Sequence, residues 1–304
     1  MAVQADKSLD SSIHPDTAMG VVRLTVSDLT RSRSFYQQVL GLNPYEAPDG
    51  AVAFGATEGR PLVALHADAS APPLNRYRTG LFHLAILVPS RVDLALGLAR
   101  LIQHRWPLDG ASDHLVSEAL YLSDPDGNGI EIYRDRPREQ WRYSADQLQM
   151  ATLPLDLQHL MGELEPAVGQ QEHAPSGTRI GHVHLQVANL ENAEAFYSGV
   201  LGFDVVVRGY PGALFVSAGG YHHHLGLNTW HSAGATAPEP EAVGLRSFDI
   251  VLPNDAELQR VSDRVMSAGL PTTPLAHGFL VHDPSGNAAV LRTAAHSRPL
   301  EAPR

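Results

Sequence analysis

The sequence contains no cysteine, fewer basic than acidic residues, and no long apolar run. The absence of cysteine excludes disulfides, thiolate zinc sites, iron–sulfur clusters and a cysteine nucleophile, so any metal must be bound by histidine, carboxylate or water. With 22 Lys and Arg against 33 Asp and Glu, the formal net charge is −11, which argues against nucleic acid or an anionic membrane as a partner. No apolar run approaches the ~18 residues of a membrane span, and the polar N-terminus lacks the apolar region of a secretory signal. We therefore expect a cytoplasmic protein.

The sequence does contain sixteen histidines and an internal duplication within its 304 residues. The duplication is clearest in the run VVRLTVSDLTRSRSFYQQVLGL (21–42), which returns 161 residues later as HVHLQVANLENAEAFYSGVLGF. A second run, DPDGNGIE (124–131), returns 159 residues later as DPSGNAAV. Two nearly equal offsets at separate places indicate duplication of a unit of about 160 residues.

Each half divides again into two modules, numbered here 1 to 4 in chain order. A strand-like run opens each module and is followed by a polar turn, an amphipathic helix and two or three short strand-like runs. The opening runs are VVRLTV (21–26), HLAILV (83–88), HVHLQV (182–187) and SFDIVL (247–252), and helices are predicted at about 30–40, 91–104, 191–200 and 255–268. Modules 1 and 2 form the first predicted domain (19–134), and modules 3 and 4 form the second (179–293). The intervening segment 135–178 breaks the pattern and is predicted to be a partly folded linker.

Four βαβββ modules resemble the vicinal oxygen chelate superfamily, and the resemblance covers 19–293. It implies an α+β fold in which paired modules curl into two half-open barrels, the glyoxalase/bleomycin-resistance/extradiol-dioxygenase fold. The fold alone does not identify a function, because this superfamily includes glyoxalases, dioxygenases, epimerases and metal-free drug-binding proteins.

Histidines at matched positions of modules 2 and 3 are candidate metal ligands. Because side chains alternate along a strand, Leu84, Ile86 and Val88 are expected to face the helix and His83 to face the concave side. His182 opens module 3 at the position that His83 holds in module 2. A lone strand histidine is more often an ordinary core or surface residue, but two at matched positions favour a shared role.

The closing strand of module 2 supplies a carboxylate. Its DPDGNG turn contains residues that tolerate positive φ, so the chain is expected to reverse there and to place Glu131 in a strand beside His83. With His182, these residues form the two-histidine, one-carboxylate set of non-haem Fe(II) oxygenases, which leaves coordination positions free. The corresponding positions of modules 1 and 4 carry poor ligands, namely Val21, Ser247 and Val290.

The run from 114 to 131 has a distinctive set of residues at fixed spacing, namely His114, Leu120, Tyr121, Asp124, Pro125, Gly127 and Glu131. These positions resemble the extradiol ring-cleavage dioxygenase pattern, and the sequence as a whole is similar to the catechol-2,3-dioxygenase-like group. Ser112 departs from the residue types that the family usually has there. The best-known extradiol enzymes place the site in their last two modules. Here the ligand set requires module 2 to pair with module 3, and module 1 with module 4. If modules 1 and 2 pair instead, His83 and Glu131 lack His182.

The run GGYHHHLGLN (219–228) is expected on a late strand of module 3, with His222 and His224 on one face and His223 on the other. The resemblance to extradiol enzymes implies that His223 is the acid–base residue, since a histidine is well suited to proton transfer near pH 7. It also implies that Tyr121 and His114 hydrogen-bond the substrate. The alternative for Tyr121 and His114 is ordinary packing, and the alternative for the histidine run is a polar loop edge.

Together these features predict an extradiol ring-cleaving dioxygenase that uses Fe(II), with Mn(II) as the alternative metal, and acts on a small aromatic diol with dioxygen. They leave open whether the chain forms a homo-oligomer. One alternative is a glyoxalase I-type lyase or isomerase, whose sites usually take a carboxylate or amide from each of two modules; module 3 has no carboxylate between Asp204 and Glu239. The other is a metal-free small-molecule-binding protein, against which the retained ligand set argues.

Overall fold

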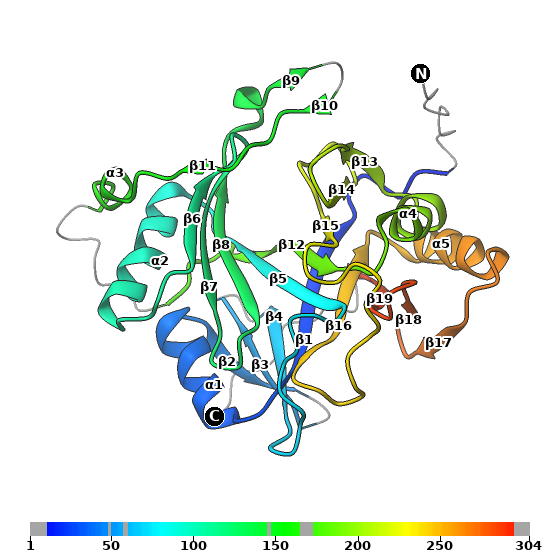
Figure 1. Ribbon diagram of the computed structural model, residues 1–304, viewed down its shortest axis with the longest axis horizontal. Helices are drawn as coiled ribbons and strands as arrows, with labels where there is room; N and C mark the ends of the chain where they lie inside the picture. Colours follow the sequence, from blue (N-terminus) through cyan, green and yellow to red (C-terminus); the bar gives the residue numbers. More distant parts are fainter. Residues whose placement is uncertain (1–10, 48–49, 57–59, 145–146, 165–172, 295–304) are drawn as a thin grey trace.

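The computed structural model describes residues 11–47, 50–56, 60–144, 147–164 and 173–294. Two large curled sheets with helices on their outer faces form the predicted α+β fold of two half-open barrels (Figure 1). The first ten residues, on which the expected lack of a secretory signal chiefly rests, lie outside the described residues, as do 145–146 and 165–172 of the linker. In the described part of the chain, no helix is long and apolar enough to cross a membrane.

The first sheet is built from modules 1 and 4. Its strands are β1 (Ala18–Val26), β2 (Asn43–Glu46), β3 (Val52–Gly55), β4 (Pro61–Ala67), β16 (Gly244–Leu252), β17 (Thr272–Leu275), β18 (Gly278–His282) and β19 (Ala288–Thr293). They are ordered β17-β18-β19-β16-β1-β4-β3-β2.

The second sheet is built from modules 2 and 3. Its strands are β5 (Gly80–Leu87), β6 (Gly110–Asp113), β7 (Ser117–Ser123), β8 (Gly129–Asp135), β11 (Leu153–Pro154), β12 (Arg179–Gln186), β13 (Asp204–Val207), β14 (Ala213–Ser217) and β15 (Leu225–Asn228). They are ordered β11-β6-β7-β8-β5-β12-β15-β14-β13. The linker supplies the edge strand β11 and a separate hairpin of β9 (Tyr143–Ser144) and β10 (Gln147–Leu148).

The opening strands of two modules pair antiparallel at the centre of each sheet. In the second sheet β5 pairs with β12, and in the first sheet β1 pairs with β16. Module 2 therefore joins module 3 across the linker and module 1 joins module 4, which is the pairing that the candidate ligand set requires.

The helices follow the opening strands at the predicted places. They are α1 (Leu29–Ser34) continued by the π-helix η1 (Phe35–Val39), α2 (Arg91–Gln103), α4 (Leu190–Glu194) continued by the π-helix η3 (Ala195–Val200), and α5 (Asp255–Ser267), with the 3₁₀-helix η2 (Arg138–Gln140) and α3 (Leu157–Met161) in the linker. Asp28 and Asn189 cap α1 and α4, because their side chains accept backbone N–H bonds from the first turn. Gly41 and Gly202 then adopt φ angles of 70° and 95°, which lets the chain leave the helix.

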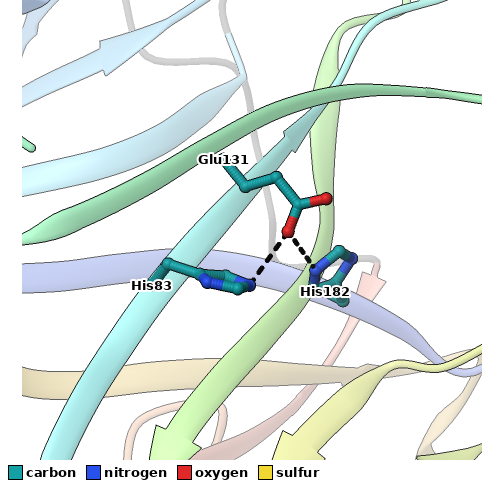
Figure 2. Close-up of side chains that lie close together, drawn as sticks. All are labelled: His83, Glu131 and His182. Carbon is teal, nitrogen blue, oxygen red and sulfur yellow. Dashed lines mark hydrogen bonds and ion pairs between the residues drawn. The ribbon is translucent and has the colours of Figure 1, made fainter. Parts of the chain in front are cut away.

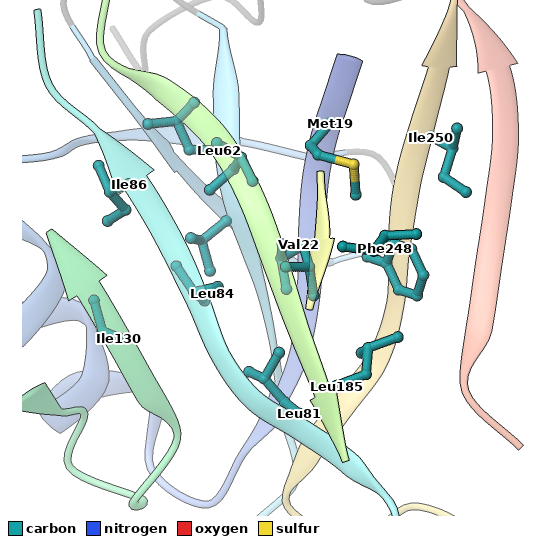
Figure 3. Close-up of a cluster of buried hydrophobic side chains, with 14 of the residues drawn as sticks. Met19, Val22, Leu62, Leu81, Leu84, Ile86, Ile130, Leu185, Phe248 and Ile250 are labelled. Carbon is teal, nitrogen blue, oxygen red and sulfur yellow. The ribbon is translucent and has the colours of Figure 1, made fainter. Parts of the chain in front are cut away.

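The core lies where the central strands of the two sheets pack against each other (Figure 3). Val22 and Phe248 of the first sheet and Leu84 and Leu185 of the second are fully buried in one cluster. Burial of each such side chain contributes about 1.5 to 3 kcal/mol. Because side chains alternate along a strand, the residues next to these on β5 and β12 face away from the core, toward the concave side of the second sheet.

The duplicated DPxGN turn links the two modules within each half. Asp124 accepts hydrogen bonds from the backbone and side chain of Asn128, both 2.9 Å long, and from the hydroxyl of Tyr36 in module 1. Asp283 makes the same three contacts in module 4, including a 3.0 Å bond from Tyr197. In module 2 this turn connects β7 to β8 and so sets the position of the strand that carries the candidate carboxylate.

Candidate metal centre

Three neighbouring strands of the second sheet position the predicted ligands. His83 lies on β5, Glu131 on the parallel strand β8, and His182 on the antiparallel strand β12. Ala85 is the register partner of both Glu131 and His182, and His83 precedes it by two residues on the same face. Because Ala85 has only a methyl side chain, it leaves space between the three longer ones.

The three side chains point toward one another at a buried spot (Figure 2). Glu131 Oε2 lies 2.9 Å from His83 Nε2 and 3.0 Å from His182 Nε2. The side chains of His83, Glu131 and His182 are 8%, 3% and 2% exposed. Among the described residues, this is the one group of three histidine or acidic side chains close enough to hold a metal ion.

Burial and mutual contact determine the charges of this group. Burial alone would raise the pKa of Glu131, but the contacts with His182 and His83 hold that pKa well below its ordinary value, so the carboxylate is ionised at pH 7. Burial lowers the pKa of His182 to about 4, which keeps its imidazole neutral. A neutral imidazole and an ionised carboxylate are the protonation states that metal coordination needs.

The three ligand atoms are better satisfied by a shared divalent cation than by hydrogen bonds among themselves. His83 Nε2 is buried and makes no hydrogen bond, although Glu131 Oε2 is only 2.9 Å away. A cation held among the three side chains would give this nitrogen a partner and would balance the buried carboxylate. Two imidazoles and one carboxylate are the facial set that leaves further coordination positions open.

His223 belongs to a hydrogen-bonded chain beside this group. Its ring centroid lies 4.1 Å from that of His182, and its Nδ1 lies 2.8 Å from Nδ1 of His222. His222 Nε2 in turn lies 3.0 Å from Oδ1 of Asp135, which also accepts a bond from Tyr221. Because a carboxylate only accepts, His222 donates through Nε2 and a neutral His222 accepts at Nδ1 from His223. A neutral His223 then carries its proton on Nδ1 and its lone pair on Nε2.

The structure corrects the expected backbone of the histidine run. Residues His222 to His224 lie in an irregular turn before β15, which begins only at Leu225, so strand alternation does not apply to them. His222 and His223 therefore contact each other directly instead of pointing to opposite faces. Burial and the neighbouring histidines lower the pKa of His223 well below its ordinary value, so it is neutral at pH 7.

Tyr121 and His114 form a second hydrogen-bonded pair, with the ring of Tyr121 next to that of His83. Tyr121 lies on β7 opposite Glu131, and its hydroxyl is 2.7 Å from Nε2 of His114. Nδ1 of His114 donates to the carbonyl oxygen of Ala151 at 2.6 Å, so Nε2 of a neutral His114 accepts the Tyr121 proton. Burial and the charge of Glu131 raise the pKa of Tyr121 well above its ordinary value, which keeps the phenol protonated.

A cavity of about 300 Å³ opens beside His83, one of the three candidate ligands. His83, Tyr121, Phe82 and His231 are among the residues that line it. The volume is at the small end of the range for ligand pockets and is sufficient for one aromatic ring.

His184 is a buried neighbour of the ligands whose role the sequence does not indicate. It faces the same side as His182, and its ring lies 4.9 Å from that of His83 and within 5.7 Å of Phe82, Trp230 and Phe215. Its Nε2 has no hydrogen-bond partner among the described residues. Burial lowers its pKa well below the ordinary value, so it packs as a neutral ring that supports the ligand strands.

Comparison with known families agrees with this architecture. The family model described as the Glyoxalase/Bleomycin resistance protein/Dioxygenase superfamily matches residues 18–132 and 179–291. The chain belongs to this superfamily. Within the superfamily it is similar to the catechol-2,3-dioxygenase of Bacillus subtilis (strain 168), with 45% identity over 285 residues that cover 92% of this chain and 98% of that protein.

Solved structures of other proteins share the fold at low identity. Glyoxalase I from Zea mays aligns with a TM-score of 0.55 and 15% identity, and the alignment covers 91% of this chain and 92% of that one. The cppA protein of Streptococcus pneumoniae TIGR4 aligns with a TM-score of 0.58 and 12% identity over 92% of this chain and 99% of that one. At these identities the likeness shows the fold alone.

Proposed function

We propose that the chain is an Fe(II)-dependent extradiol ring-cleaving dioxygenase that acts on catechol or a related dihydroxylated aromatic compound with dioxygen. The observation that carries the proposal is the convergence of His83, Glu131 and His182 at one buried point beside a cavity. The 45% identity to a protein named catechol-2,3-dioxygenase supports it independently.

His83, Glu131 and His182 would hold the metal in this proposal. When bound, the metal supplies a Lewis acid that lowers the pKa of the diol hydroxyls, and it offers open positions for the diol and dioxygen. Fe(II) is the metal we propose, and Mn(II) suits the same oxygen and nitrogen donors. The cavity volume favours a diol with a single ring.

His223 would accept a proton from a diol hydroxyl at Nε2, the nitrogen that its bond to His222 leaves free. Tyr121 lines the cavity beside His83 and would hydrogen-bond a substrate oxygen, with its own proton directed to His114. The protein would thus place a base beside His182 and a hydrogen-bonding phenol beside His83.

The test is an anaerobic reconstitution with Fe(II), followed by addition of catechol and then of air. We expect consumption of one dioxygen per catechol and a yellow ring-fission product that carries both atoms of isotopically labelled dioxygen. A parallel reconstitution with Mn(II) identifies the preferred metal by its turnover. No dioxygen uptake with any catechol or hydroquinone, together with isomerisation of a thiol–methylglyoxal adduct, would reject the dioxygenase in favour of a glyoxalase.

A further inference from the structure

The half-barrel of modules 1 and 4 contains a second and larger cavity. It has a volume of about 680 Å³ and is lined mainly by residues of β1, β4, β16 and the end of β19. This volume lies within the range of small-molecule pockets. The cavity shares no lining residue with the cavity beside the candidate metal ligands.

The strand register shows which residues replace the metal ligands in this half-barrel. Asp249 on β16 lies opposite Val290 on β19, as Ala85 lies opposite Glu131 in the other sheet. The positions equivalent to His83, Glu131 and His182 are thus Ser247, Val290 and Val21, none of which is a strong metal ligand. The side chain that stands where the metal centre has Ala85 is instead a carboxylate.

Two arginines share this carboxylate. Arg23 contacts Asp249 through two nitrogens, at 2.5 and 3.3 Å, and Arg292 contacts Oδ2 of Asp249 at 3.3 Å. The Asp249 side chain is only 2% exposed, whereas those of Arg23 and Arg292 are 24% and 23% exposed. Two guanidinium groups against one carboxylate leave the floor of the cavity with one excess positive charge. The buried Nε of Arg292 has no hydrogen-bond partner among the described residues.

The remaining lining extends this charge and adds an apolar wall. Arg60 and Arg179 also line the cavity and are exposed, and Asp16 joins Asp249 as its second acidic lining residue. Four arginines thus line the cavity with two aspartates, although the whole chain has a net charge of −11. The rest of the wall is largely apolar, with the side chains of Met19, Val21, Leu62, Ile180, Val251 and several alanines. A ligand that suits both parts has a negative head and an apolar body.

We propose that this cavity binds a small organic carboxylate with an apolar or aromatic body. The planar fork of an arginine matches a carboxylate with two parallel hydrogen bonds. Asp249 holds Arg23 and Arg292 in place and neutralises only one of them, which leaves charge available for the ligand. The apolar wall favours organic anions over small inorganic ones, because it stabilises the bound ligand only by burying the ligand's apolar surface.

The first test follows Met19, which lines the cavity, by NMR of protein labelled at its methionine methyl groups. We expect benzoate to shift the Met19 signal, assigned by its loss in Met19→Leu, at concentrations where benzamide and acetate do not. Benzamide keeps the ring but loses the charge, and acetate keeps the charge but loses the ring. Equal response to benzoate and benzamide would overturn the role of the arginines, and equal response to acetate would overturn the role of the apolar wall.

The second test uses Arg292→Gln, which leaves the paired contacts between Arg23 and Asp249 intact. We expect benzoate affinity measured by calorimetry to fall by about tenfold or more, as loss of a charged hydrogen-bond donor implies. Arg208→Gln is the matched control, because this arginine pairs with Glu194 on the surface of module 3. Unchanged affinity in Arg292→Gln, or an equal loss in Arg208→Gln, would reject the site. The Met19 titration of the unaltered protein decides the question even if Arg292→Gln does not fold.

Discussion

The hydrogen-bonded chain from Asp135 to His223 makes a sharp prediction for the variant Asp135→Asn. The carboxylate accepts from His222 Nε2 at 3.0 Å, and this bond fixes the His222 tautomer that accepts from His223. An asparagine can present its amide N–H to His222 instead, which allows the opposite tautomer. His222 then donates to His223 through Nδ1, and the proton of His223 moves to Nε2, the nitrogen proposed as the base.

The size of the effect follows from the bond that changes. Hydrogen bonds to charged groups contribute about 1.5 to 3 kcal/mol and neutral ones about 0.5 to 1.5 kcal/mol, so the preference for the productive tautomer weakens by about 1 to 2 kcal/mol. This corresponds to a loss of about 5- to 30-fold in kcat. The Asp135 side chain is 26% exposed and does not touch the ligand set, so bound iron and the KM for catechol should change little.

The assay is dioxygen uptake by the Fe(II)-loaded variant, with iron content measured on the same sample. Glu163→Gln is a matched control, because it makes the same carboxylate-to-amide change at a residue that pairs with Arg91 away from the site. Unchanged kcat in Asp135→Asn would refute the relay. A loss of activity that parallels a loss of iron would show that Asp135 supports the ligands and not the base.

Two further predictions concern stability. Asp124→Ala removes the acceptor of three or more hydrogen bonds at the turn before β8, and should lower the free energy of unfolding by about 2 to 4 kcal/mol in urea denaturation. Asp283→Ala should lower it by a similar amount. A loss below about 1 kcal/mol in both variants would contradict the role given to the turn. The second concerns pH: burial lowers the folded-state pKa of His182 to about 4 and of His224 to about 3, whereas an unfolded histidine titrates near 6.5. Because the unfolded chain then binds more protons, stability of the metal-free protein should be complete above pH 6.5 and fall as the pH drops toward 4. His224→Gln should flatten this slope in thermal melts, and an unchanged slope would show that His224 titrates normally in the folded protein.

The sequence predicts the fold and the proximity of the three candidate ligands because both depend on periodic patterns. Alternation in HLAILV separates Leu84, which is fully buried in the core, from His83, which points toward Glu131 and His182. The module repeat then relates His83 to His182. The pairing of modules 2 and 3 was needed for these residues to meet, and the pairing of β5 with β12 supplies it.

The surroundings of the ligands are less predictable because they depend on tertiary contacts. His222 to His224 lack alternating apolar neighbours, and Gly219 and Gly220 just before them have φ angles of 60° and 66°, so the chain turns where a strand was expected. Asp135 lies 87 positions from His222, and no local pattern joins them. Arg23 and Asp249 likewise form a pair only because β1 and β16 come together from opposite ends of the chain.

The claim that modules 2 and 3 hold a catalytic iron is tested most directly by the iron content and catechol turnover of Glu131→Gln. Ser247→Ala is the control, because Ser247 takes the place of His83 in the other half-barrel. After anaerobic loading with Fe(II) and gel filtration, we predict one iron per chain and full turnover for the unaltered protein and for Ser247→Ala. For a folded Glu131→Gln we predict loss of both bound iron and dioxygen uptake. Retention of iron and of catechol cleavage in Glu131→Gln would contradict the account.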